Sequence, residues 1–347
     1  MTQKLRLATG LIIAAYVIPH LINHALGLIS LDAMEAMRRV MSAVWGNAVG
    51  GVLLFGSLAL HAVLALEAVY RRSHLRLPRW QLAQLGLGIA IPPLIMTHAI
   101  GTRATSELLG YDITYPYVLT AIWLGGPWSL VKQTALVLVV WLHLVVGLHF
   151  WLRLKPWYPK AVPTLYAMAL LVPVLGLLGY FRATADVAQL ATDPAWVERL
   201  FAQRMSAPPD LDGILKALEP MILGGMAAAL LAILAARQVR RLMRNRAGAY
   251  RLQYPPDRTL TVPLGQTVLE ALRVAGIPHA SVCGGRGRCT TCRVRVGDGL
   301  DDLPPPEGVE RDALARIHAE AEVRLACQIR PRCTPQAVIT RSSPATA

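Results

Sequence analysis

The chain has 347 residues, of which 54% are hydrophobic and 16% charged, and its mean hydropathy is +0.43. A water-soluble chain of this length rarely has a positive mean hydropathy, so the composition excludes an ordinary soluble globular protein. The formal net charge of +14 is not accompanied by any nucleic-acid-binding motif, and we therefore expect no nucleic-acid partner.

Six apolar stretches occupy the first two-thirds of the chain, at residues 7–29, 50–70, 81–101, 130–152, 162–181 and 219–236. Each is long enough, or nearly so, to cross a bilayer. Basic residues crowd the segment before the first stretch, the connections 71–79 and 153–160, and residues 237–246. Six crossings place all of these on one side, which the positive-inside rule makes cytoplasmic. We expect a multi-pass protein of the bacterial inner membrane with both termini in the cytoplasm.

Six of the nine histidines fall within these spans: His20 and His24, His61, His98, and His143 and His149. Ionisable residues inside a membrane are costly and are by default candidates for function. Polar contacts between helices can explain one or two of them, but not one on each of four successive helices. The pattern therefore favours cofactor binding.

The depth of these histidines suggests two pairs. His61 and His143 each lie ten residues before the arginine that ends their helix, which places both about 15 Å from the cytoplasmic side. His24 and His98 share a depth of about 27 Å from the same side. One iron could bridge each pair, so the pattern predicts two haem b groups stacked across the membrane.

Three alternatives stay open for the histidines. His20 lies one helical turn before His24 on the same face and could replace it as a ligand. His149 is close to the cytoplasmic end of its helix, which is typical of an interfacial or quinone-site residue. A single haem, or no haem at all, is also compatible with the sequence.

The C-terminal third has the pattern of a small α+β domain. Strands are expected at 250–254, 260–264 and 293–297, and helices at 267–275 and 310–317. The first helix begins with Thr267 and has Glu270 three residues later, the signature of a capping box. Residues 332–347 have a poor pattern for a final strand and tail.

The cysteines of this region have the most specific spacing in the chain. Three lie close together as C-x5-C-x2-C and a fourth follows 34 residues later: Cys283, Cys289, Cys292 and Cys327. Such a set can wrap a two-iron cluster with two sulfurs per iron, and the glycines within the loop allow the close backbone approach that this needs. Structural zinc, which more often uses two C-x2-C pairs or histidines, is the alternative. Cys333 lies outside the pattern and is expected to be a spare thiol.

The cysteine region and the histidine pattern each resemble a known family. Residues from about 249 to 335 resemble a [2Fe–2S] ferredoxin domain of the adrenodoxin sort, which implies a β-grasp fold. The histidine pattern resembles the dihaem cytochrome b anchors of succinate:quinone and fumarate:quinone reductases. The fold expected from both is an α-helical membrane bundle of six transmembrane helices, similar to succinate dehydrogenase cytochrome b, at 1–245, and then an α+β ferredoxin domain at 246–347.

The combination resembles the N-terminal regulatory part of bacterial membrane-bound class III adenylate cyclases, in the segments Leu7–Leu11, His20–Gly27 and Leu325–Pro331. That resemblance implies a haem anchor that senses the quinone pool and a catalytic domain after the ferredoxin. The chain ends at Ala347 without room for such a domain, so we expect no catalytic domain within it.

Two functions remain open, a redox sensor that regulates a cyclase and a stand-alone electron carrier. The expected partners are membrane quinone, the bilayer, and either a cyclase catalytic domain or a soluble redox protein, with a homodimer left open. An acidic stretch could dock a basic partner or form an ordinary solvated surface: Asp298, Asp301, Asp302, Glu307, Glu310 and Asp312.

Overall fold

The computed structural model describes residues 2–72, 77–205, 208–246, 248–254, 258–331 and 336–341. The chain divides into two compact units. The first comprises Met1–Glu67 and Arg79–Leu231, and the second comprises Ala68–Pro78 and Ala232–Ala347. The division falls within the last long helix, α10 (Pro209–Arg246).

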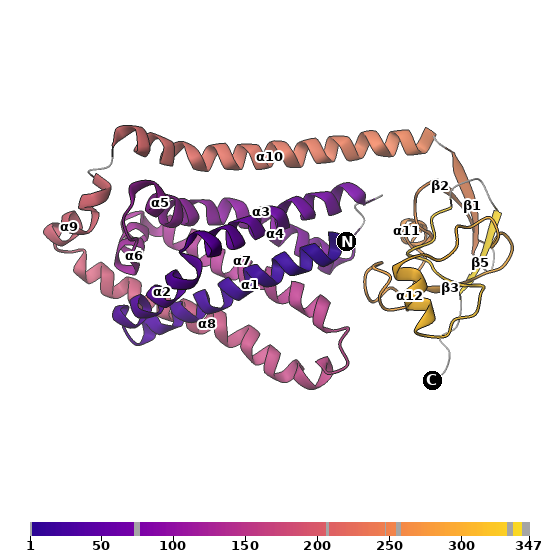
Figure 1. Ribbon diagram of the computed structural model, residues 1–347, viewed down its shortest axis with the longest axis horizontal. Coiled ribbons are helices and arrows are strands. Elements are labelled where there is room, and N and C mark those ends of the chain that lie inside the picture. The colour runs from indigo at the N-terminus through magenta and orange to yellow at the C-terminus, as the bar shows by residue number, and fades with distance from the viewer. Residues whose placement is uncertain are drawn as a thin grey trace. The chain divides into compact units, whose positions relative to one another are not determined.

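Six long helices make up the apolar part of the chain: α1 (Thr2–Ala25), α3 (Ala48–Arg71), α4 (Arg79–Ala99), α7 (Gly126–Leu152), α8 (Tyr158–Leu190) and α10 (Figure 1). Within the described residues, the helical segments long and apolar enough to cross a bilayer number six, and each contains one predicted span. The prediction of six apolar helices is therefore confirmed, and their composition indicates a membrane protein.

The connections opposite the basic segments contain short helices: α2 (Leu31–Trp45), α5 (Thr105–Leu109), α6 (Tyr115–Leu124) and α9 (Pro194–Met205). A 3-10 turn, η1 (Leu26–Leu28), follows α1, and a π-helical turn, η2 (Ile100–Ala104), follows α4. In α2, Ser30 caps the helix by accepting a hydrogen bond from the Ala33 amide (3.1 Å). This cap satisfies one of the free N–H groups at the start of the helix.

Close packing of α1 and the adjoining turn against α8 depends on glycine. A Cβ atom at Gly179 would lie 2.1 Å from the carbonyl oxygen of His24, and one at Gly27 would lie 2.3 Å from the carbonyl oxygen of Gly179. Small residues allow this approach, which is the usual way for helices to pack in a membrane. Leu21, Val137 and Trp141 form a buried cluster beside the contact.

The second unit contains a five-stranded sheet in the order β2-β1-β5-β3-β4. The strands are β1 (Ala249–Tyr254), β2 (Arg258–Pro263), β3 (Arg293–Val296), β4 (Val323–Leu325) and β5 (Gln336–Arg341). Only β1 and β5 run parallel; the other neighbours are antiparallel. Two helices accompany the sheet, α11 (Val268–Val274) and α12 (Val309–Ala315). The predicted strands and helices of this region are confirmed to within a few residues.

The start of α11 matches its prediction. The Thr267 hydroxyl accepts from the Glu270 amide (3.2 Å), and the Glu270 carboxylate accepts from the Thr267 amide (2.9 Å). The helix then buries Leu269 and Leu272 in the same core as Leu252 of β1. This core supports the loop that carries three of the four cysteines.

The prediction that the C-terminal segment is a poor final strand is wrong for residues 336–341. They form β5, in which Ala337 pairs with Leu252 of β1 and Thr340 pairs with Arg295 of β3. The segment is short, but as the central strand it has hydrogen-bonding partners along both edges. Its pattern alone gives no sign of those partners. The predicted spare thiol, Cys333, lies outside the described residues.

Candidate metal centre and histidine pairs

The cysteine loop of the second unit follows α11 and leads into β3, and Cys327 lies just after β4. The three loop glycines have left-handed backbones, with φ of 72° at Gly284, 90° at Gly285 and 66° at Gly287. A Cβ atom at Gly287 would lie 2.9 Å from the Val309 side chain. The glycines are therefore required both for the turn and for the close approach of the loop to its surroundings.

The four thiols lie in two pairs. The sulfur atoms of Cys292 and Cys327 are 3.3 Å apart, and Cys283 and Cys289 are neighbours, with the Cys283 amide donating to Cys289 Sγ. All four cysteines are free of disulfides. No three described His, Cys, Asp or Glu side chains converge on a single point. The thiols thus come together two by two, as a two-iron cluster with two sulfurs per iron requires.

Hydrogen-bond donors surround these sulfur atoms. The Arg286 amide donates to Cys283 Sγ (3.3 Å), and the Cys283 amide donates to Cys289 Sγ (3.2 Å). The Thr291 hydroxyl is 3.0 Å from Cys289 Sγ, and the Gln328 side-chain amide donates to Cys327 Sγ (3.2 Å). Donors of this kind stabilise a thiolate over a thiol, which is the form that binds iron.

The pKa values of the thiols follow from this pairing. The neighbouring thiol of Cys289 lowers the pKa of Cys283 to about 4, with help from backbone N–H groups and against the effect of burial. The Cys292 thiol likewise lowers the pKa of Cys327, and the Gln328 amide adds to the effect. The pKa values of Cys289 and Cys292 are raised, first by their partner thiols and then by burial. In each pair, therefore, one thiol has a lowered pKa and its neighbour a raised one.

Glu310, predicted to lie in an exposed acidic stretch, is buried. Its carboxylate accepts two hydrogen bonds from the Arg324 guanidinium, each 3.0 Å long, and both side chains are 4% exposed. The prediction is wrong for this residue because a charge pattern along the chain does not reveal an ion-pair partner 14 residues away.

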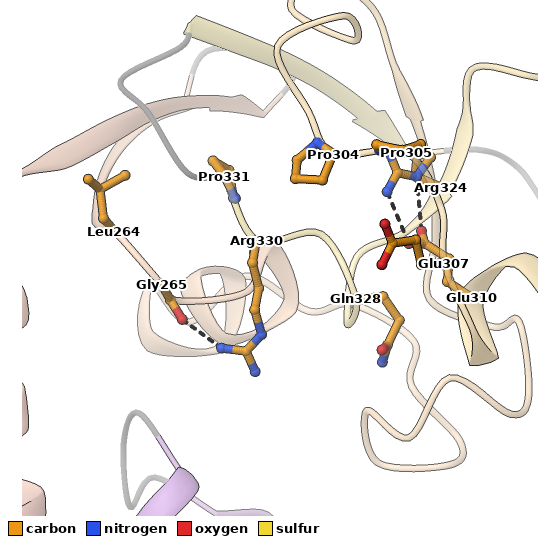
Figure 2. Close-up of a pocket in the computed structure, with 10 residues that line it drawn as sticks. All are labelled: Leu264, Gly265, Pro304, Pro305, Glu307, Glu310, Arg324, Gln328, Arg330 and Pro331. Atoms are coloured by element: carbon orange, nitrogen blue, oxygen red, sulfur yellow. Dashed lines mark hydrogen bonds and ion pairs between the residues drawn. The ribbon is translucent and has the colours of Figure 1, made fainter.

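The ferredoxin-like sheet domain has a cleft of about 430 Å³ (Figure 2). Pro304 and Pro305 line it together with Arg330, which donates to the Gly265 carbonyl oxygen (2.6 Å). Gln328 also lines the cleft and reaches Cys327 Sγ with the same side chain. One amide thus connects this surface to a candidate iron ligand.

In the first unit, His61 of α3 and His143 of α7 face each other with ring centres 6.4 Å apart. If each imidazole nitrogen bound one metal ion between the rings at about 2 Å, the two ring centres would lie about 6 Å apart. Glycines make room on both sides, since a Cβ atom would lie 3.3 Å from the His61 ring at Gly10 and 3.1 Å from the His143 ring at Gly88. The structure therefore brings the two histidines of the predicted inner pair together.

The predicted outer pair, His24 and His98, lies in one group of rings with the alternative ligand His20. The ring of His98 lies 6.0 Å from that of His20. His24 lies 4.7 Å from His20 and packs against Tyr115 and Tyr180. His149 stands apart from both pairs, and its Nδ1 is 2.7 Å from the Tyr158 hydroxyl.

Several side chains around these groups were not predicted. The Thr9 hydroxyl lies 3.1 Å from His61 Nδ1, and the Gln84 amide donates to the His143 carbonyl oxygen (3.1 Å) and is 3.4 Å from His143 Nε2. Gln328 is a third. Thr9 and Gln328 lie within the segments 7–11 and 325–331 that carry the family resemblance, so the resemblance could have indicated them. No sequence pattern indicated Gln84.

Comparison with known proteins concerns the second unit. Residues 253–332 match the 2Fe-2S iron-sulfur cluster binding domain family. Over 73 residues, the chain is 37% identical to the F subunit of the Na(+)-translocating NADH-quinone reductase of Yersinia enterocolitica and 38% identical to that of Klebsiella pneumoniae. Each match covers 21% of this chain and 17% of the relative.

Solved structures with similarity include an ISC-like [2Fe-2S] ferredoxin from Pseudomonas putida, 30% identical, which covers 27% of this chain and 92% of that one with a TM-score of 0.24. A ferredoxin from Rhodopseudomonas palustris is 28% identical, covers 27% and 99% respectively, and has the same TM-score. The family match and the paired cysteines agree: the C-terminal part of the chain is a ferredoxin-type domain that binds a [2Fe–2S] cluster. The six histidines of the apolar helices lie outside the matched residues.

Proposed function

We propose that the chain is a membrane-anchored redox protein that exchanges electrons between the membrane quinone pool and a [2Fe–2S] cluster. The observation that carries this proposal is the pairing of the four thiols, with hydrogen-bond donors directed at their sulfur atoms, in a chain that also carries two histidine pairs with metal-ligand spacing. The quinone-reductase relatives add a quinone-linked context through the domain they share with this chain.

Cys283 and Cys289 would hold one iron, and Cys292 and Cys327 the other. When bound, the cluster supplies a one-electron carrier. The Arg286 amide and the Gln328 side chain would then donate to ligand sulfurs, which stabilises added negative charge and tunes the reduction potential.

The proposal also assigns two haem b groups to the histidine pairs. His61 and His143 would hold one haem and His20 and His98 the other, with His24 as the alternative to His20. When bound, haem also supplies a one-electron carrier. Thr9 would orient His61 through Nδ1, which leaves Nε2 for the iron. On the His143 side, Gln84 approaches Nε2 and would have to turn away.

The regulatory hypothesis assigns this module to an adenylate cyclase whose activity it controls according to the redox state of the quinone pool. Its support is the resemblance of the segments 7–11, 20–27 and 325–331. The carrier hypothesis needs rapid electron transfer to a soluble acceptor, whereas the regulatory hypothesis does not. We further propose insertion in the bacterial inner membrane with both termini in the cytoplasm, as the basic connections favour.

The test is a redox difference spectrum of the detergent-purified full chain, combined with iron analysis, pyridine haemochrome quantification and EPR. We expect two non-haem irons and about two haems b per chain, with both centres reduced by a quinol. Absence of a Soret band would overturn the haem assignment. A cluster that dithionite reduces but quinol leaves oxidised would overturn the quinone link.

A further inference from the structure

We infer that His24 and Tyr180 form a binding site for the headgroup of a quinone or quinol, beside the outer histidine pair. This inference rests on the proposed function, because it identifies where the quinone of that function would bind. It concerns a place in the first unit where α1, α6 and α8 meet, and it assigns to His24 a role other than iron ligation.

The observation is a pair of polar atoms that are buried and have no partner. His24 Nδ1 and the Tyr180 hydroxyl make no hydrogen bond of normal geometry with the described residues, although the two residues are only 5% and 2% exposed. The nearby Thr184 hydroxyl donates its proton to the main-chain oxygen of Tyr180 (2.8 Å). Buried polar groups are almost always paired, so two unpartnered ones on neighbouring side chains need an explanation.

Packing alone does not provide that explanation. Phenylalanine would fill the position of Tyr180 equally well and would avoid the penalty of burying a hydroxyl without a partner. A third aromatic side chain, Tyr115 of α6, stands edge-on to the His24 ring at 6.0 Å, and the Tyr180 ring lies 6.3 Å from His24 at an angle of 27°. Two tyrosine rings thus pack against the ring of His24.

The chemistry of this set selects a class of ligand. The Tyr180 hydroxyl can donate to a carbonyl oxygen, and His24 Nδ1 can accept from a hydroxyl or donate to a carbonyl, according to its tautomer. The aromatic rings favour a flat, uncharged ring. A quinone offers carbonyl oxygens and a quinol offers hydroxyl groups on such a ring, so one site can bind both.

The position of His24 agrees with separate roles for the two histidines of α1. His20 lies 6.0 Å from His98, which is a suitable spacing for two ligands of one iron, and His24 lies 4.7 Å from His20. A headgroup held at His24 would therefore lie next to the outer pair. His20 would then be the ligand and His24 the quinone-binding residue.

The experiment compares Tyr180→Phe with Tyr158→Phe in the detergent-purified full chain, with decylubiquinone as the probe. Tyr158 is a matched control because its hydroxyl also meets a histidine, His149, but outside the inferred site. We expect Tyr180→Phe to raise the dissociation constant of decylubiquinone at least tenfold and Tyr158→Phe to change it less than twofold. Without quinone, Tyr180→Phe should melt at the wild-type temperature or higher, because it removes an unpartnered buried hydroxyl.

The outcomes separate this inference from the proposed function. Wild-type affinity in Tyr180→Phe, or weakened binding in Tyr158→Phe alone, would overturn the site while leaving quinone-linked electron transfer intact. Lower thermal stability of quinone-free Tyr180→Phe would also overturn it, since that result would mean that the hydroxyl has a structural partner such as water. Failure of quinol to reduce the wild-type cluster would overturn the proposed function itself.

Discussion

Glu310 and Arg324 form a two-point ion pair inside the ferredoxin domain, and the same carboxylate also accepts a hydrogen bond from the Leu325 amide (2.8 Å). Glu310 belongs to α12 and Arg324 to β4, the strand that ends just before Cys327. The pair therefore connects a helix to the segment that presents the fourth cysteine. The pair holds the segment that presents Cys327 in place and does not itself contact a sulfur atom.

Removing one charge of this pair should destabilise the domain. Glu310→Gln leaves the Arg324 guanidinium buried without its counter-charge, which costs roughly 3–5 kcal/mol. We expect the visible absorbance of the cluster to be lost at a clearly lower temperature. Asp312→Asn is the control on the same helix, because the Asp312 side chain is 70% exposed. Equal effects of the two substitutions would contradict a structural role for the buried pair.

The glycine beside His143 gives a test of the inner histidine pair. A side chain at Gly88 would meet the His143 ring, whereas Gly86, two residues earlier on α4, has nothing within 4 Å of its Cβ position. We expect Gly88→Leu to displace the ring and remove about one haem per chain, while Gly86→Leu retains both. Pyridine haemochrome analysis measures the difference, and unchanged haem content in Gly88→Leu would argue against this pocket.

The outer ligand can be identified by two alanine substitutions on α1. Because the His98 ring lies 6.0 Å from that of His20, His20→Ala should lose the outer haem and His24→Ala should keep it. Redox difference spectra at graded potentials resolve the two haems. The reverse pattern would restore His24 as the ligand and would remove it from the inferred quinone site.

The ferredoxin domain should lose stability at alkaline pH through Tyr250. Burial raises the pKa of this hydroxyl, the nearby Glu270 charge adds to the effect, and Arg330 opposes it. In the unfolded chain the group ionises near pH 10, so the stabilisation is complete below pH 10 and decreases above it by about 1.4 kcal/mol per pH unit. Denaturation at pH 8 to 12 should show this decrease in the wild type. Tyr250→Phe should reduce the slope, and equal slopes would contradict the prediction.

Gln328 should tune the cluster through its hydrogen bond to Cys327 Sγ. A donor stabilises the more negative, reduced state, so Gln328→Leu should lower the reduction potential by roughly 40 mV, equivalent to about 1 kcal/mol. An EPR-monitored potentiometric titration measures the shift. Gln253→Leu, on an exposed position of β1, should leave the potential unchanged. A wild-type potential in Gln328→Leu would mean that this amide does not reach the sulfur when the cluster is bound.

Local patterns were sufficient for much of this protein. The six apolar helices can be predicted from runs of hydrophobic residues. A helix that crosses a bilayer must be long and apolar, and both properties can be read from one stretch of sequence. Cys283, Cys289 and Cys292 lie within ten residues, so chain connectivity alone keeps their thiols near one another. The capping box at Thr267 is equally local, since its two hydrogen bonds join residues three positions apart.

Tertiary structure decided the features that join distant residues. Pairing along both edges made 336–341 the central strand, Arg324 buried the charge of Glu310, and the ring of His98 came to lie beside that of His20. His20 and His24 share one helical face, so periodicity cannot separate them. Which one faces a partner is set by the rotation of α1 against its neighbours, and that rotation depends on packing contacts that no single segment of the sequence contains.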